Sequence, residues 1–233
     1  MPHIYKNTFF VLDFDRTLAD TDRIHDILAT VIERETNITA GNIRSAKQET
    51  ESRGETFDTI GFVHHALATQ QSVVSWQHIQ RQFIAESLNQ DLLEPFARTL
   101  LDILDEHGIP YGIITYGTEA WQLAKLEAVG LFEVPHLVTQ IKEKGKLLEG
   151  WKHGNETFII PPAMTRDFQP ILAEAIVFLD DKVVSFQDIP PGVRGVLIRS
   201  PNGELLPSQR GVLPASVASV TGLDGAIELL FPS

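Results

Sequence analysis

The run from Phe9 to Thr17 constrains the fold of this chain more than any other segment. Four apolar residues, Phe-Phe-Val-Leu, lead into Asp13, and Asp15 and Thr17 follow at alternate positions. An apolar, β-rich run of this length is typical of a strand buried in a parallel sheet. Unpaired buried carboxylates are unfavourable, and functional groups of open α/β sheets gather at the carboxyl ends of the strands. The run therefore predicts a reactive carboxylate pair at the mouth of a sheet.

Further apolar runs predict more strands of the same sheet, and helical patterns separate most of them. The predicted strands cover residues 8–12, 111–114, 136–138, 175–179 and 195–198. The helical patterns of residues 97–107 and 118–129 each end at a glycine, which is a common helix stop. Such alternation is typical of a parallel sheet with helices on its faces. We therefore expect an α/β fold with a three-layer, Rossmann-like core.

The segment from Thr21 to Asn89 has a different pattern, with helical periodicity and no convincing strand. Ile24, Ile27 and Leu28 share one face of its first helix, and Ser75 is a candidate N-cap of its last. An all-helical insertion of about 70 residues is too long for an ordinary loop. We therefore predict an all-helical cap over residues 20–90, inserted after the first strand. Residues 1–19 and 91–233 would form the α/β core.

The composition excludes several classes of site and function. The chain has no cysteine, so disulfides, thiol catalysis and cysteine-zinc sites are excluded. Acidic residues outnumber basic ones by 31 to 19, which disfavours the basic surface of nucleic-acid-binding proteins. No apolar run approaches the ~18 residues of a membrane span, and the first residues lack a signal-peptide pattern. We therefore expect a soluble, cytoplasmic protein without nucleic-acid or membrane partners.

Four predicted strand ends or loops carry polar groups that suit one kind of chemistry. They are the run Asp13 to Thr17, the strand-end Thr115, the lysines Lys142, Lys144 and Lys146, and the pair Asp180-Asp181. Carboxylates act as nucleophiles toward phosphorus, and an oxygen-rich set such as Asp13, Asp180 and Asp181 suits Mg²⁺. A metal ion and one lysine would offset charge on the transferring group. The pattern therefore favours phosphoryl transfer through an aspartyl intermediate.

The same elements resemble the haloacid dehalogenase-like (HAD) hydrolase superfamily. The matching parts are Asp13-x-Asp15-x-Thr17, Thr115, the lysine region, Asp180-Asp181 and the helix from Gln122 to Leu131. The helical insertion is similar to the family's C1-type cap. The resemblance implies that Asp13 is the nucleophile, and that Asp15 is the general acid and base. It also implies that Thr115 and a lysine hold the phosphoryl oxygens, and that Asp13, the backbone carbonyl of Asp15, Asp180 and Asp181 bind Mg²⁺.

Three details refine this resemblance. Dehalogenases and phosphonatases of the family typically lack an aspartate at the position of Asp15, so the chain resembles its phosphatases and phosphotransferases. Arg16 stands where the family usually has a small residue, and its role is left open. The usual lysine-proline pattern is missing, so spacing alone leaves Lys142, Lys144 and Lys146 as candidates. We favour Lys144 because Gly145 would then start the following helix.

The sequence thus predicts a Mg²⁺-dependent phosphomonoester hydrolase that acts on a small phosphorylated metabolite. The alternatives are a phosphomutase or other phosphotransferase using the same site, and a non-catalytic module that binds a phosphorylated ligand. A role of the acidic surface in protein interaction rests on net charge alone. Lys182 follows the acidic pair and offers it a counter-charge. The substrate, the cap residues that face it and the oligomeric state are not predicted.

Overall fold

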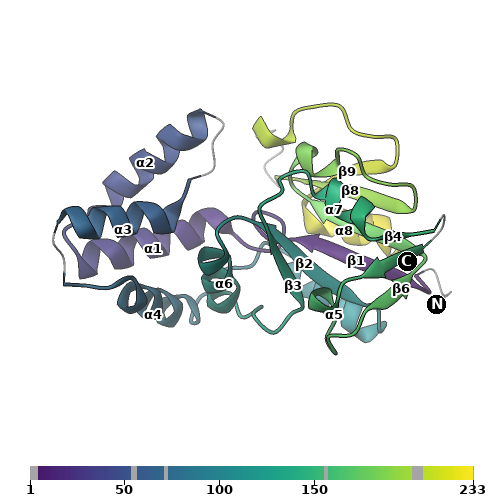
Figure 1. Cartoon of the computed structure of the whole chain (residues 1–233), viewed down its shortest axis with the longest axis horizontal. Coiled ribbons are helices and arrows are strands. Elements are labelled where there is room, and N and C mark those ends of the chain that lie inside the picture. The colour runs from purple at the N-terminus through teal and green to yellow at the C-terminus, as the bar shows by residue number, and fades with distance from the viewer. Residues whose placement is uncertain (1–4, 54–56, 71–72, 155–156, 201–206, 233) are drawn as a thin grey trace. The chain divides into compact units, whose positions relative to one another are not determined.

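The computed structural model describes residues 5–53, 57–70, 73–154, 157–200 and 207–232 (Figure 1). The chain forms two compact units. One unit contains residues 1–19, 93–116 and 134–233, and the other contains residues 20–92 and 117–133. Among the described residues, no helix has the length and apolarity needed to cross a membrane.

A six-stranded parallel sheet lies at the centre of the first unit, in the order β3-β2-β1-β7-β8-β9. Its strands are β1 (Thr8–Asp13), β2 (Tyr111–Tyr116), β3 (His136–Thr139), β7 (Ala175–Asp180), β8 (Val193–Arg199) and β9 (Val217–Thr221). The central strand β1 is bonded on both sides, with Leu12 opposite Ile113 of β2 and Leu179 of β7. The predicted parallel sheet is therefore confirmed, and β9 is a strand that the sequence interpretation missed.

The two faces of β1 pack into different layers, because successive strand residues point to opposite faces. Phe9 and Val11 belong to a buried cluster that includes residues of the segment between β3 and β7. On the other face, the ring of Phe10 lies 6.1 Å from that of Phe231, which follows the last helix. That helix, α8 (Gly222–Leu230), contacts β8, β9 and α5 (Ala97–Glu106). The predicted three-layer α/β core is confirmed.

The segment between β3 and β7 contributes a short helix and a second, smaller sheet. Its elements are α7 (Lys144–Gly150), β4 (Lys152–His153), β5 (Thr157–Ile160), the 3₁₀ turn Pro162–Met164 and β6 (Ile171–Ala173). The three strands pair antiparallel in the order β4-β5-β6. Two further 3₁₀ turns, η2 (Val183–Phe186) and η3 (Pro207–Gln209), follow β7 and β8. The small sheet was not predicted from the sequence.

The second unit is helical, as the apolar periodicity of its sequence predicts. Its helices are α1 (Thr21–Glu35), α2 (Ala40–Ser52), α3 (Thr59–Thr69), α4 (Trp76–Ser87) and α6 (Glu119–Ala128). The predicted N-cap Ser75 is confirmed, because its side chain accepts a hydrogen bond from the backbone N–H of His78. Trp121 of α6 packs against Phe83 of α4 in the core of this unit, with ring centroids 5.4 Å apart. The boundaries predicted from the sequence, residues 20–90 for the cap and residues 1–19 and 91–233 for the core, stay a prediction.

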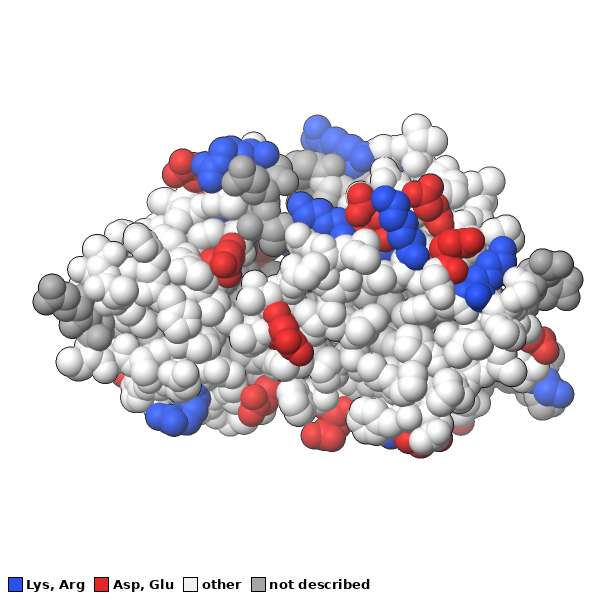
Figure 2. Space-filling view, in the orientation of Figure 1, with Lys and Arg blue, Asp and Glu red and all other residues white. Residues whose placement is uncertain are grey.

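Charged side chains are spread over the face shown in Figure 2. Lys and Arg residues are interspersed there with Asp and Glu residues, and the described residues of that face form no broad basic patch. This distribution is in keeping with the formal net charge of −12.

Candidate active site

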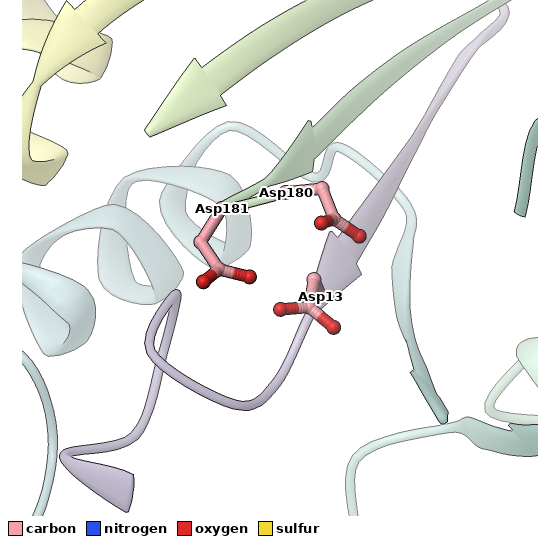
Figure 3. Close-up of side chains that lie close together, drawn as sticks. All are labelled: Asp13, Asp180 and Asp181. Atoms are coloured by element: carbon pink, nitrogen blue, oxygen red, sulfur yellow. The ribbon is translucent and has the colours of Figure 1, made fainter. Parts of the chain in front are cut away.

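The carboxyl ends of β1 and β7 bring three carboxylates together (Figure 3). Asp13 is the last residue of β1, Asp180 is the last residue of β7, and Asp181 follows it. The two strands are parallel neighbours, so their final residues lie side by side. One oxygen from each of the three side chains lies within 4.8 Å of the other two, and all three residues are buried. The sheet thus concentrates three negative groups in a small buried volume.

Lys144, the first residue of α7, supplies the counter-charge to two of these carboxylates. Its side chain is only 2% exposed, and its ammonium pairs with Asp13 and with Asp180 Oδ2, the latter at 2.7 Å. By contrast, Lys142 lies over the ring of Tyr116, and the side chain of Lys146 is 54% exposed and lies 3.8 Å from Glu143. Of the three candidate lysines, the structure brings Lys144 to the carboxylates.

Gly145 allows α7 to approach the turn η2 closely enough to hold Lys144 there. A Cβ atom at position 145 would lie 2.0 Å from the carbonyl oxygen of Gln187, far inside any allowed contact. The helix begins at Lys144, one residue before the start at Gly145 that the sequence interpretation favoured. The absence of a side chain at position 145 therefore positions the neighbouring lysine.

The loop after Asp13 is a tight turn held by its own backbone. The carbonyl of Phe14 accepts hydrogen bonds from the N–H groups of Leu18 and Ala19, each at 3.0 Å. The hydroxyl of Thr17 donates to Asp13 Oδ2 at 2.9 Å. Arg16 has a φ of 60°, a left-handed conformation that is uncommon outside glycine. The turn therefore holds Arg16 in a conformation that glycine adopts more readily.

Asp15 and Thr115 face one another at the same edge of the sheet. Thr115 is fully buried near the end of β2, and its hydroxyl lies 3.5 Å from Asp15 Oδ2 in donor geometry. Asp15 itself is partly exposed. A partly exposed carboxyl group at this edge of the sheet can exchange protons with a bound molecule or with water.

Burial and mutual repulsion dominate the protonation of the carboxylate cluster. Burial is the larger cause and the charge of Asp180 the smaller one, and together they raise the pKa of Asp13 to about 6. Lys144 opposes both influences. Burial raises the pKa of Asp181 to about 8, although the ammonium of Lys182 acts against it. Burial lowers the pKa of Lys144, but Asp13 and Asp180 outweigh this influence and raise it above its ordinary value. Lys144 is therefore positively charged across the physiological pH range.

The chemistry of the cluster fits a divalent metal ion. Both carboxylate oxygens of Asp181 are buried, and among the described residues no group donates a hydrogen bond to either of them. Buried carboxylates without partners are costly, and a cation relieves that cost. Asp13, Asp180 and Asp181 offer only oxygen ligands, the preference of Mg²⁺ rather than of softer metals.

The structure thus brings Asp13, Lys144, Asp180 and Asp181 together, and it brings Asp15 next to Thr115. The roles assigned to these residues stay a prediction. The sequence interpretation treated Lys182 only as a counter-charge, because its one visible signal was its place after the acidic pair. In the structure, the backbone N–H of Lys182 donates to Asp180 Oδ1 at 2.8 Å, so the residue is fixed at the cluster.

The chain matches solved structures but neither family models nor curated proteins. No family model matches it, and no curated protein matches it significantly. A protein of Burkholderia xenovorans LB400 assigned to the haloacid dehalogenase-like hydrolases is 18% identical, with a TM-score of 0.65 over 97% of this chain and 96% of that one. YfnB of Bacillus subtilis, assigned to the HAD hydrolases and bound to magnesium, is 14% identical, with a TM-score of 0.55 over 96% and 98%. A dehalogenase in an intermediate complex is 17% identical, with a TM-score of 0.52 over 96% and 97%.

These likenesses establish the fold. The chain has the fold of the HAD-like hydrolases over its full length, with helices inserted after β1 as in the C1 type of cap. The predicted resemblance is confirmed at this level. Identities of 14–18% leave the reaction open, and the matched structures include a dehalogenase.

Proposed function

We propose that the protein is a Mg²⁺-dependent phosphomonoesterase that forms an aspartyl-phosphate on Asp13 and acts on a small phosphorylated metabolite. The observation that carries the proposal is the buried cluster of Asp13, Asp180 and Asp181, in which Asp181 has no hydrogen-bond donor among the described residues. A cation that satisfies Asp181 would also offset the charge of a phosphoryl group at Asp13. These three carboxylates and the backbone carbonyl of Asp15 would hold Mg²⁺, which when bound supplies that positive charge.

Asp13 has the properties that a nucleophile toward phosphorus needs. Its carboxylate is held by Lys144 and by the hydroxyl of Thr17, which fix the orientation of its oxygens. A carboxylate oxygen of Asp13 attacks phosphorus, the bond between phosphorus and the ester oxygen breaks, and an aspartyl-phosphate forms. The pKa of about 6 leaves Asp13 ionised, and therefore nucleophilic, at neutral pH.

Asp15 would serve both halves of the reaction. In its protonated form it gives a proton to the leaving ester oxygen, because an alkoxide is too basic to leave unassisted. The resulting carboxylate then takes a proton from a water molecule that attacks the aspartyl-phosphate. This second step releases inorganic phosphate and regenerates Asp13. Thr115 and Lys144 would donate hydrogen bonds to the phosphoryl oxygens during both steps.

The roles proposed for Asp15 and for the carboxylate cluster favour ester hydrolysis over dehalogenation. A halide ion leaves without a proton, so a dehalogenase that uses a carboxylate nucleophile has no need of an acid such as Asp15. Nor does attack on an uncharged carbon require a buried cation site to neutralise the transferring group. Asp15 and the carboxylate cluster are both accounted for by phosphoryl transfer.

A screen of phosphomonoesters tests the proposal. The purified protein should release inorganic phosphate from at least one nucleotide, sugar phosphate or cofactor phosphate in the presence of Mg²⁺. EDTA should stop the release, excess Mg²⁺ should restore it, and Asp13→Asn should abolish it while the protein stays folded. The matched variant Asp102→Asn, at an exposed position of α5, should keep full activity.

Two results would contradict the proposal. One is phosphate release that persists in Asp13→Asn, and the other is the absence of release across the whole panel. A parallel assay of halide release from short-chain 2-haloacids separates the dehalogenase reaction. Rapid acid quenching followed by peptide mass spectrometry should find the phosphoryl group on Asp13.

A further inference from the structure

Lys182 carries a positive charge beside the carboxylate cluster, and within the described residues this charge forms no ion pair. It follows Asp181 directly, and its backbone N–H is anchored to Asp180 Oδ1 at 2.8 Å. Its side chain is partly exposed. In the described part of the chain, no side chain forms an ion pair or hydrogen bond with its ammonium group. The donor capacity of this ammonium is therefore available to a bound molecule.

Lys144 is in the opposite situation. Its ammonium is buried and already donates to two carboxylates, Asp13 and Asp180. An incoming anion must share this group with those partners. The two lysines therefore divide into one that holds the protein's own carboxylates and one that is open to an external anion.

The charges of the cluster indicate why binding a phosphate dianion needs a second positive side chain besides Lys144. Asp13, Asp180 and Asp181 carry three negative charges when ionised, and Lys144 offsets one of them. A divalent cation would offset the remaining two, which leaves no net attraction for a phosphate dianion. The ammonium of Lys182 acts on the same carboxylates, because it lowers the pKa of both Asp181 and Asp13. With Lys182, the loaded cluster has an excess positive charge.

We propose that Lys182 is a substrate-binding residue whose ammonium contacts the phosphoryl group of the incoming ester, and inorganic phosphate in the same way. The inference rests on the phosphatase function proposed above and adds a second phosphate-binding lysine to it. Lys182 determines how tightly the phosphate group binds. The charge of Lys182 is permanent in this role, and no proton transfer is assigned to it.

The competing explanation is that Lys182 only balances the charge of Asp181. In that case removing the charge of Lys182 would make the cluster more negative, and Mg²⁺ would bind more tightly. Phosphate affinity would fall no further than it falls when another nearby lysine is replaced. Phosphate affinity and Mg²⁺ affinity therefore separate the two explanations when both are measured on the same variants.

The experiment is a calorimetric titration of inorganic phosphate into the Mg²⁺-saturated protein. Lys182→Gln should weaken phosphate binding by about tenfold or more, the effect of losing one charge-assisted hydrogen bond. Lys182→Arg keeps the charge and should retain most of the affinity. Lys146→Gln is the matched control, because it removes the same charge from a largely exposed lysine in α7. It should bind phosphate within about twofold of the wild-type affinity.

Steady-state kinetics on the best substrate of the screen gives a second readout. Lys182→Gln should raise KM by about the same factor as the phosphate dissociation constant and lower kcat far less. Thermal unfolding checks that the variant is folded, and Lys182→Met serves as a second neutral variant if it is not.

Wild-type phosphate affinity in both neutral variants would overturn the inference, and so would an equal loss in Lys146→Gln. If the wild-type protein hydrolyses phosphomonoesters while Lys182→Gln binds phosphate normally, only the role of Lys182 fails. If the wild-type protein neither hydrolyses any ester nor binds phosphate, the proposed function fails with it.

Discussion

The ammonium of Lys144 donates a hydrogen bond to Asp180 at 2.7 Å across 36 positions of the chain, and the same group pairs with Asp13, 131 positions away. One buried lysine thus joins the ends of two neighbouring strands. Because both carboxylates are buried, their negative charges are costly without a paired cation. The strand ends proposed to carry the chemistry are therefore stabilised by a residue that is itself proposed to take part in it.

Replacing Lys144 by methionine should reduce phosphatase activity by about 100-fold or more, because the phosphoryl group loses a preorganised donor. The metal-free variant should also unfold at a lower temperature, because Asp13 and Asp180 lose their shared counter-charge. Initial rates and thermal unfolding measure the two effects. Lys146→Met, at a largely exposed position of the same helix, should change neither. Wild-type rates in Lys144→Met would exclude the assigned role.

Replacing Asp15 by asparagine should separate the two halves of the reaction. With alkyl phosphates, turnover should fall by about 10²–10⁴-fold, because the leaving oxygen is no longer protonated. With p-nitrophenyl phosphate, whose leaving group needs no proton, the first step should persist while hydrolysis of the intermediate is slow. Rapid-mixing experiments should therefore show a burst of p-nitrophenol close to one equivalent per protein. Equal losses on both kinds of ester, with no burst, would count against Asp15 as the proton donor.

The main sheet and the helical insertion could be predicted because their signals are local in the sequence. The apolar run before Asp13 and the equivalent run before Asp180 each mark a buried strand ending in charge, and both strands are in the structure. Strand β9 was missed because Val217–Thr221 is only partly buried and lacks a continuous apolar pattern. The small sheet β4-β5-β6 was missed because its strands have only two to four residues.

Spacing in the sequence could not show which lysine pairs with the carboxylates, because the pairing depends on a tertiary contact. Lys142, Lys144 and Lys146 occupy alternate positions, and local pattern treats them alike. The structure distinguishes them through the approach of α7 to Gln187, more than 40 positions further along the chain. The buried, unpartnered state of Asp181 also depends on long-range packing, so the sequence alone allowed it to be an ordinary turn residue.

Gly145→Ala should disturb the site without touching any proposed catalytic group. The new methyl would lie 2.0 Å from the carbonyl oxygen of Gln187, so α7 must shift and carry Lys144 with it. We expect a loss of about 1–3 kcal/mol in the free energy of unfolding, together with reduced activity. Gly150→Ala, at the other end of the helix, meets no atom within 4 Å. That control should keep its activity and gain about 0.5–1 kcal/mol in stability.

Asp181 should make the metal-free protein less stable as the pH rises. Its pKa is raised from 3.8 to about 8 in the folded state, mainly by burial. Between these values the folded state holds a proton at Asp181 that the unfolded state has already released. Because stability falls with pH wherever the folded state binds more protons, the contribution of Asp181 is lost progressively between about pH 4 and pH 8. Asp13 acts in the same direction up to about pH 6.

Asp181→Asn removes this loss, because an amide has no proton to release and carries no charge at any of these pH values. In EDTA, the variant should therefore gain unfolding temperature relative to the wild type between pH 5 and pH 8, while Asp102→Asn should show no such gain.

Mg²⁺ should stabilise the wild type more at pH 8 than at pH 5, because it binds the ionised cluster. It should stabilise Asp181→Asn much less at either pH. Differential scanning calorimetry at the two pH values measures all of these differences. If the difference in unfolding temperature between Asp181→Asn and the wild type in EDTA did not widen with pH, burial would not hold Asp181 protonated.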